Sequence, residues 1–343
     1  LETDLVKAVR ASSSNEQAYR KLNQIVDRFN LSHTAVITPW VAKNIFGEGD
    51  KFHLGLYLQK IKHEGKNKYF IRSMMHGSAA REAGLLIGDE ITSLNQLNIK
   101  LSPRLTLAGY EHRRQMYTIK IDKNEAVSIE FKRTKEDKKR TVIATANQPL
   151  SAKKSISKSI RLFPLGSDNV AGYIHLWNFM SRENATILKE ALQNNFSKAS
   201  GLVIDLRGRG GKVDVIRIIA KMLSDQRKPT ILIIDQESRS AKEMLAHRLK
   251  GLPHITLVGE TTAGAVLPAT LENLNADAKL MIPSQRGDSQ ILPFMKNTRL
   301  EGRGAFPDIN VQSNLPFSAG KDAILLKSIE ILKKEILGKL LRL

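Results

Sequence analysis

Cysteine is absent from the 343-residue sequence. The chain therefore has no disulfide bond, no thiolate nucleophile and no cysteine-based zinc site. This absence fits a periplasmic or secreted protein that exposes no thiol to oxidation. Long apolar runs are also missing, because no stretch approaches the roughly 18–20 residues that span a bilayer. The sequence begins at Leu1 rather than at Met, so a signal peptide or lipid anchor could have preceded it.

Acidic residues are few compared with basic ones: 34 Asp and Glu stand against 54 Lys and Arg, a formal net charge of +20. A field of this sign attracts nucleic acids, anionic membrane surfaces and acidic proteins. The densest basic run, residues 132–140, lies between two β-like runs, which predicts a hairpin tip. It carries no interleaved aromatic residues on which bases could stack. We therefore interpret the charge as a solvated lysine-rich surface and expect no specific nucleic-acid partner, with nucleic-acid binding kept as a minor alternative.

Three regions of different pattern follow one another along the chain. Residues 1–48 begin with apolar residues at spacings of three and four, which predicts a helical N-terminal segment. Residues 50–150 consist of short β-like runs, which is typical of a small β-rich domain. In residues 160–343 apolar runs alternate with helical patterns, which predicts an α/β core with a mainly parallel sheet flanked by helices. The Lys- and Ser-rich stretch 153–159 is predicted to be a linker.

The elements of the core region are predicted from its apolar runs. Strands are expected at 171–176, 201–206, 230–235 and 255–258. Helices are expected at 184–193, 213–223 and 241–250, with a final amphipathic helix at 321–341. The final helix most simply packs on the core, and its basic face also fits peripheral association with a membrane surface.

Two loops follow predicted neighbouring strands at the sheet edge where ligands bind in open parallel sheets. The loop at 205–212 is glycine-rich and opens a helix, so its backbone N–H groups can point at a negative charge. The spacing matches neither of the common nucleotide-binding glycine motifs, which disfavours a phosphate site. An oxyanion hole and a plain tight turn both remain open interpretations.

The second loop, residues 236–240, places Ser240 between a strand and a helix. A serine in this position is either an N-cap or an exposed nucleophile, and a nucleophile needs a base. His247 lies seven residues further along the same predicted helix, about 10 Å away at roughly 1.5 Å per residue. The base must therefore come from elsewhere in the chain.

Five motifs occur in a fixed order along the core region. They are GYIHL from Gly172, GLVIDLRGRGGK from Gly201, SRSAKE from Ser238, LVGETTAG from Leu257 and GAFPD from Gly304. This ordered set, over about residues 30–330, resembles the tail-specific or carboxyl-terminal-processing serine protease superfamily. The resemblance implies an α/β protease core and a nucleophilic Ser240. His175, in the first motif, is interpreted as an ordinary strand residue of the sheet.

The β-rich region resembles a PDZ domain inserted into the protease. The segment LGLYL at 54–58 is similar to the carboxylate-binding loop of PDZ domains, and 77–80 and 83–91 are similar to the following helix and strand. The resemblance implies that an extended peptide adds a strand there. The implied peptide-binding residues are Leu54, Gly55, Leu56, Tyr57 and Leu58.

One branch of the superfamily uses a Ser–Lys dyad, but Ala265 occupies the corresponding position here. The chain is more similar to the Ser-His-Glu branch, which includes the tricorn protease core and the chlamydial protease-like activity factor. That resemblance implies His33 as general base, in a segment before the insertion that belongs to the protease core. It also implies that Ser32 and Glu301 complete a polar network. The implied oxyanion-hole donors are the N–H groups of Gly211, Lys212 and Ala241.

The combined prediction is a serine endopeptidase that binds protein C-termini or extended segments and cleaves them through an acyl-enzyme on Ser240. It needs no metal and no organic cofactor. Its partners are expected to be protein or peptide substrates, and homo-oligomerisation is compatible with the sequence. The expected location is periplasmic or secreted. The main alternative is a catalytically inactive pseudoprotease or PDZ peptide-binding scaffold, suggested by the missing lysine and by Arg239 and Lys242 beside Ser240.

Overall fold

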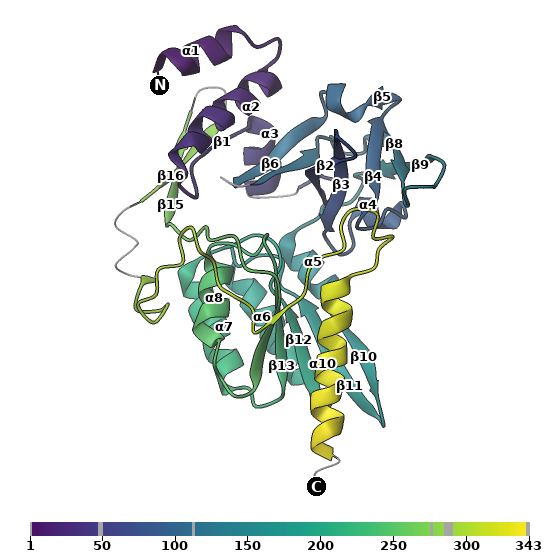
Figure 1. The fold of residues 1–343 in the computed structure, drawn as a ribbon, viewed down its shortest axis with the longest axis vertical. Helices are drawn as coiled ribbons and strands as arrows, with labels where there is room; N and C mark the ends of the chain where they lie inside the picture. Colours follow the sequence, from purple (N-terminus) through teal and green to yellow (C-terminus); the bar gives the residue numbers. More distant parts are fainter. Residues whose placement is uncertain (1, 47–50, 112–113, 275–276, 285–290, 341–343) are drawn as a thin grey trace. The chain divides into compact units, whose positions relative to one another are not determined.

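The computed structural model describes residues 2–46, 51–111, 114–274, 277–284 and 291–340 (Figure 1). The chain forms two compact units. The first comprises Leu1–Ser151, Leu267–Gln285 and Asn314–Lys321. The second comprises Ala152–Val266, Arg286–Ser313 and Asp322–Leu343. Within the described part of the chain, no helix is both long and apolar enough to cross a membrane.

The N-terminal segment lies in the first unit, whereas the sequence placed 1–48 with the catalytic core. The reason is strand pairing, because β1 (Ala35–Ile37) pairs antiparallel with β16 (Lys279–Pro283), and β16 pairs with β15 (Ala269–Asn273). The predicted helical segment consists of two helices, α1 (Glu2–Arg10) and α2 (Asn15–Val26). They separate because Ser14 caps α2 by accepting a hydrogen bond from the Gln17 N–H.

The predicted β-rich region forms an antiparallel sheet in the order β6-β7-β2-β3-β4-β8-β9. The strands are β2 (Leu56–His63), β3 (Lys66–Met74), β4 (Glu90–Leu94), β6 (Leu105–Glu111), β7 (Arg114–Ile119), β8 (Ala126–Lys132) and β9 (Arg140–Thr145), with β5 (Leu97–Asn98) beside β4. Val127, Ile129 and Phe131 alternate with more exposed residues and face the core. The basic run 132–140 connects β8 to β9, as the hairpin prediction required.

The second unit is built on a six-stranded sheet in the order β10-β11-β12-β13-β14-β17. Its strands are β10 (Arg161–Gly166), β11 (Asn169–His175), β12 (Gly201–Asp205), β13 (Thr230–Ile234), β14 (Ile255–Gly259) and β17 (Ile309–Asn310). All pairs from β11 to β17 are parallel, and β10 pairs antiparallel with β11. Among the named strands of the described residues parallel pairing occurs in this sheet alone, so the chain as a whole is a mixed α/β structure with antiparallel sheets in its first unit.

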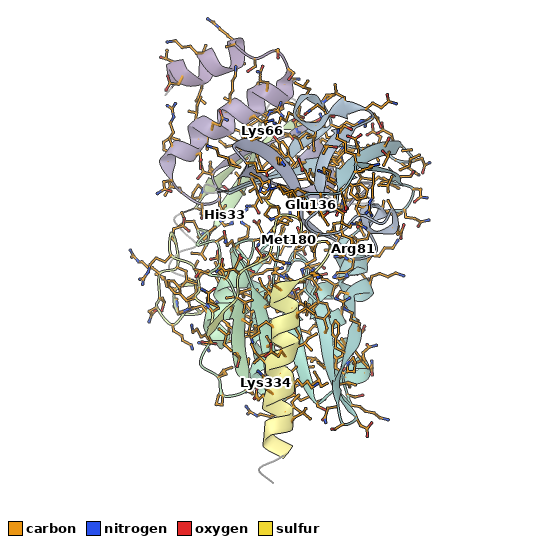
Figure 2. All side chains as sticks on the ribbon, turned by 45° about the vertical axis from the view of Figure 1, so that its right-hand side comes forward. His33, Lys66, Arg81, Glu136, Met180 and Lys334 are labelled. Carbon is orange, nitrogen blue, oxygen red and sulfur yellow. The ribbon has the colours of Figure 1, made fainter. Side chains whose placement is uncertain are left out.

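Helices cover both faces of this sheet (Figure 1). The crossovers α6 (Arg182–Glu190), α7 (Val213–Asp225) and α8 (Ala241–Leu249) join successive parallel strands, and right-handed connection places them on one face. The C-terminal helix α10 (Ala323–Leu340) packs on the other face through residues such as Leu332. Lys334, labelled in Figure 2, is exposed on α10.

The predicted linker at 153–159 is instead helix α5 (Ala152–Ser159). Its Lys residues lie outside while Ser155, Ile156 and Ser159 are buried. A composition rich in Lys and Ser therefore hid a buried helix face made of Ile156 and two serines, and that face packs in the second unit.

Candidate active site

The two predicted loops meet beside Ser240. Their strands β12 and β13 are adjacent and parallel, so both loops leave the same edge of the sheet. A Cβ built on Gly210 would lie 2.6 Å from the Ser240 Cβ and 3.1 Å from its Oγ. Only glycine permits this approach, because real Cβ contacts do not come so close. The glycine-rich loop therefore lies directly against the candidate nucleophile.

Ser240 adopts a strained backbone conformation between β13 and α8, with φ 54° and ψ −125°. Such angles cost energy for a residue with a Cβ and are concentrated at functional sites. Sharp strained strand-to-helix turns are also the means by which α/β hydrolases present a serine hydroxyl. The turn is held in place because the Ser240 N–H donates to the Ala265 carbonyl at 2.9 Å and to Glu243 Oε1 at 3.0 Å.

Glu243 connects this turn to the LVGETTAG segment. Its buried carboxylate also accepts hydrogen bonds from the N–H groups of Gly264 and Ala265, at 2.6 and 2.8 Å, and from the Thr262 hydroxyl at 2.5 Å. The sequence analysis assigned no role to Glu243. The available signal was the spacing Ser240-x-x-Glu243, which is the pattern of a helix capping box.

Burial raises the pKa of Glu243 to about 7, although its hydrogen-bond donors favour the charged form. The folded chain therefore binds this proton more tightly than the unfolded chain, in which glutamic acid titrates near about 4.3. The resulting stabilisation is complete below about pH 4.3 and is lost as the pH rises to about 7.

We therefore predict that raising the pH from 4.5 to 7.5 lowers the unfolding free energy of the native chain relative to Glu243→Gln by up to about 3 kcal/mol. Urea unfolding of both proteins across this range measures the difference. The prediction would be wrong if the unfolding free energies of the two proteins changed in parallel with pH over the whole range.

The backbone of the glycine-rich loop is fixed by a bridge to Phe179. The Phe179 N–H donates to the Gly210 carbonyl at 2.9 Å, and the Lys212 N–H donates to the Phe179 carbonyl at 3.0 Å. The sequence predicted the Lys212 N–H as an oxyanion donor. In the structure this N–H already donates to the Phe179 carbonyl. In a parallel bridge the N–H of the central residue points away from the partner, so the Gly211 N–H faces away from Phe179.

Buried charges anchor the start of the same loop. Arg207 forms ion pairs with Asp205 and with Asp322, which precedes α10. Burial by itself raises the pKa of Asp205, but the Arg207 guanidinium outweighs it and holds that pKa well below its usual range. The Tyr173 hydroxyl donates to the same carboxylate at 2.9 Å. These ion pairs and this hydrogen bond fix the position of Asp205 and Arg207, where the glycine-rich loop begins.

The predicted base, His33, lies in the first unit (Figure 2). Its Nδ1 is 3.0 Å from the Ser32 Oγ, and that oxygen accepts a hydrogen bond from the Leu267 N–H at 3.3 Å. His33 has a left-handed backbone with φ 56°, which is uncommon for a residue with a side chain. Ser32 is buried. The structure thus supports the Ser32–His33 contact within the first unit.

Glu301 lies in the second unit together with Ser240. Its Oε2 accepts a hydrogen bond from the Val266 N–H at 2.9 Å. Val266 directly precedes Leu267 in the chain, and the boundary between the two units falls between them. The Glu301 carboxylate and the Ser32 hydroxyl therefore make these contacts each within its own unit, and the predicted cooperation of His33 with Ser240 stays a prediction.

The implied peptide-binding residues do not form an open edge. Leu54, Gly55, Leu56, Tyr57 and Leu58 are all buried. The Gly55 N–H, expected to bind a terminal carboxylate, donates instead to His53 Nδ1 at 3.0 Å.

Strand β2 is also paired on both sides. It lies between β3 and β7, and Leu58 faces Tyr117 in β7. Strand β7 therefore pairs with β2 at Leu58 and Gln59, and peptide binding by residues 54–58 stays a prediction. The sequence could not show this, because the pairing joins residues far apart in the chain.

The comparisons with known proteins agree with this fold. Residues 218–311 match the model of peptidase family S41. Carboxy-terminal processing protease CtpB of Bacillus subtilis is 26% identical over 224 residues, which cover 57% of this chain and 44% of that protein. The chain thus spans less than half the length of this curated relative.

Two solved structures share the fold. The photosystem II D1 C-terminal processing protease matches with a TM-score of 0.53 at 18% identity, over 98% of this chain and 90% of that one. Mature CPAF matches with a TM-score of 0.51 at 11% identity, over 98% of this chain and 91% of that one. The solved structures show the shared fold, and the family match over residues 218–311 together with the sequence similarity shows a peptidase family S41 domain, homologous to the carboxy-terminal processing proteases CtpA and CtpB.

Proposed function

We propose that the chain is a serine-type endopeptidase with Ser240 as its nucleophile. The observation that carries the proposal is the strained turn at Ser240, held by Glu243 and lying against Gly210. A plain N-cap serine has no need of this strain or of a glycine loop against its side chain. The peptidase family S41 domain supports the same assignment.

In the proposed reaction His33 takes the hydroxyl proton of Ser240 as the oxygen attacks the peptide carbonyl. If Nδ1–H of His33 donates to Ser32 Oγ, the lone pair needed for a base lies on Nε2. Glu301 is proposed to stabilise the imidazolium that forms, as a carboxylate does in related triads.

The tetrahedral oxyanion is proposed to be stabilised by the N–H groups of Gly211 and Ala241. The imidazolium then returns the proton to the leaving amine, and the acyl-enzyme on Ser240 remains. Water attacks this ester while His33 accepts its proton. The imidazolium then returns that proton to Ser240 Oγ as the bond between Oγ and the acyl carbon breaks, and the new carboxylic acid leaves. The scheme uses only side-chain and backbone groups, so no metal or organic cofactor is assigned.

The proposed substrates are C-terminal or extended segments of proteins, and the relatives in Bacillus subtilis are named as carboxy-terminal processing proteases. A periplasmic or secreted location is proposed with this activity, since the chain has no cysteine and resembles proteases of those compartments.

A fluorophosphonate probe tests the proposal, because it reacts with activated serines. The expected result is labelling at Ser240, located by peptide mass spectrometry, together with cleavage of an unfolded casein-like protein. A folded sample without labelling or cleavage would overturn the proposal and favour the inactive scaffold.

A further inference from the structure

Lys242 is a wholly buried lysine that the proposed reaction does not use. It lies two residues after Ser240 in the first turn of α8, and its exposed fraction is 0%. Burying an unpaired ammonium group is costly, so such a residue needs strong compensating contacts. It is also absent from the Ser–Lys pattern, in which the lysine would stand at Ala265.

The contacts of Lys242 are with two backbone carbonyls. Its Nζ donates to the Arg207 carbonyl at 2.6 Å and to the Trp177 carbonyl at 3.0 Å. Nζ also lies 5.6 Å from the centre of the Phe179 ring, within the range of a cation–π contact. These partners belong to the segments that follow β12 and β11, on the two sides of the glycine-rich loop.

The same two segments hold the oxyanion loop in place. Arg207 is followed by Gly208–Gly211, and Trp177 is followed by Phe179, which bridges Gly211. One side chain on the nucleophile's own helix therefore ties both supports of the loop to that helix. A shift in these supports would move the Gly211 N–H relative to Ser240 Oγ.

We propose that Lys242 is a positioning residue that fixes the glycine-rich loop at the distance from Ser240 which the oxyanion donors require. This inference deepens the proposed function and rests on it. Lys242 has no role in proton transfer in this proposal, because its Nζ donates hydrogen bonds to the carbonyl oxygens of Arg207 and Trp177.

The charged groups around Lys242 leave these two contacts intact. Burial lowers the pKa of Lys242 to about 7, while Asp205 and Asp235 favour its charged form and Arg207 disfavours it. His175, whose pKa burial lowers to about 4, is neutral at pH 7 and donates from Nε2 to the same Arg207 carbonyl at 2.9 Å. A neutral amine still has two N–H donors, so both carbonyl contacts survive loss of the proton. The role therefore depends on the hydrogen bonds more than on the charge.

Lys242→Met tests the inference, because methionine has similar length and no donor. We expect kcat to fall about 10²-fold while KM changes less than about threefold, since the lost contacts position the loop whose N–H groups stabilise the oxyanion. The affinity for a peptide boronate, which forms a tetrahedral adduct, should fall in proportion to kcat/KM. The affinity for the cleaved product peptide should not change. Lys250→Met, at the far end of α8, is the matched control and should leave all four quantities unchanged.

Chemical rescue covers the case in which Lys242→Met folds poorly. The chain has no cysteine, so Lys242→Cys introduces the only thiol. After unfolding, alkylation with 2-bromoethylamine and refolding, the side chain regains an amine at nearly the length of lysine. We expect this product to recover most of the wild-type kcat per folded molecule, and the same variant alkylated with iodoethane to recover none of the lost activity.

The outcomes separate the two proposals. Cleavage that persists in Ser240→Ala would overturn the proposed function itself. Labelling and cleavage that depend on Ser240, with kcat and boronate affinity unchanged in Lys242→Met, would overturn only this inference. The inference would also be overturned if Lys242→Met lost boronate affinity and product-peptide affinity in parallel. Equal recovery with both alkylating agents would overturn it too, because each result would show that Lys242 only fills the core.

Discussion

Replacement of Ser240 by alanine is expected to lower kcat/KM for cleavage of an unfolded protein by about 10⁴–10⁶-fold. The variant removes the attacking oxygen and keeps the Cβ and the backbone bonds from Ser240 N–H to Ala265 and Glu243. The melting temperature should therefore stay within a few degrees of the wild type. Steady-state cleavage assays and thermal unfolding measure the two quantities.

Ser238→Ala is the matched control for this experiment. Ser238 lies two residues earlier and is buried, and its hydroxyl donates to the Leu206 carbonyl at 3.1 Å and accepts from the Asp235 N–H at 3.1 Å. Its loss should lower the unfolding free energy by about 1–2 kcal/mol and leave fluorophosphonate labelling at Ser240 intact. Activity in Ser240→Ala above a tenth of wild type would remove Ser240 from the nucleophile's role.

Replacement of His33 by alanine is expected to lower kcat about 10³–10⁴-fold, because the serine hydroxyl is a weak nucleophile without a base. KM for the same substrate should change little, since His33 is assigned no ground-state contact. Ser32→Ala should give a smaller loss, about 10–100-fold, because it removes only the group that orients Nδ1. Progress curves at saturating substrate give these values.

Non-additivity decides whether His33 and Ser240 act together. Adding His33→Ala to Ser240→Ala should cause no further loss of residual activity, because a base has no function without its nucleophile. His254→Ala serves as the histidine control and should keep the wild-type kcat. His254 is half-buried directly before β14, and its Nε2 lies 3.0 Å from the Leu223 carbonyl oxygen. Losses that add across the double variant would separate His33 from the reaction of Ser240.

Much of the second unit was predictable from local pattern. Continuous apolar runs predicted strands β11 to β14, and the 3.6-residue period predicted the helices between them. Once these strands are parallel neighbours, the loops after β12 and β13 must leave one edge, and the prediction that they meet was confirmed at Gly210 and Ser240. The helix at α5 was missed because only Ile156 of its buried face is apolar, and the other buried residues, Ser155 and Ser159, are polar.

Contacts between distant segments were not predictable in this way. Which amide of the glycine loop is already bonded depends on the bridge from Phe179, which took Lys212 out of the predicted donor set. The PDZ resemblance at 54–58 rested on local motif, which could not indicate that Leu58 pairs with Tyr117 of β7. Nothing in the sequence indicated that Lys242 is buried, which depends on the contacts of its Nζ with the Trp177 and Arg207 carbonyls.

The sequence by itself determined the parallel strands of the second unit, the position of Ser240 at the start of a helix and the order of the family motifs, because each depends on residues close together in the chain. The tertiary structure decided which N–H groups are engaged, which strand edge is open and which charged side chains are buried. These properties depend on strand register and on packing between segments that are distant in the chain, and a one-residue change in register would alter them without changing the local pattern.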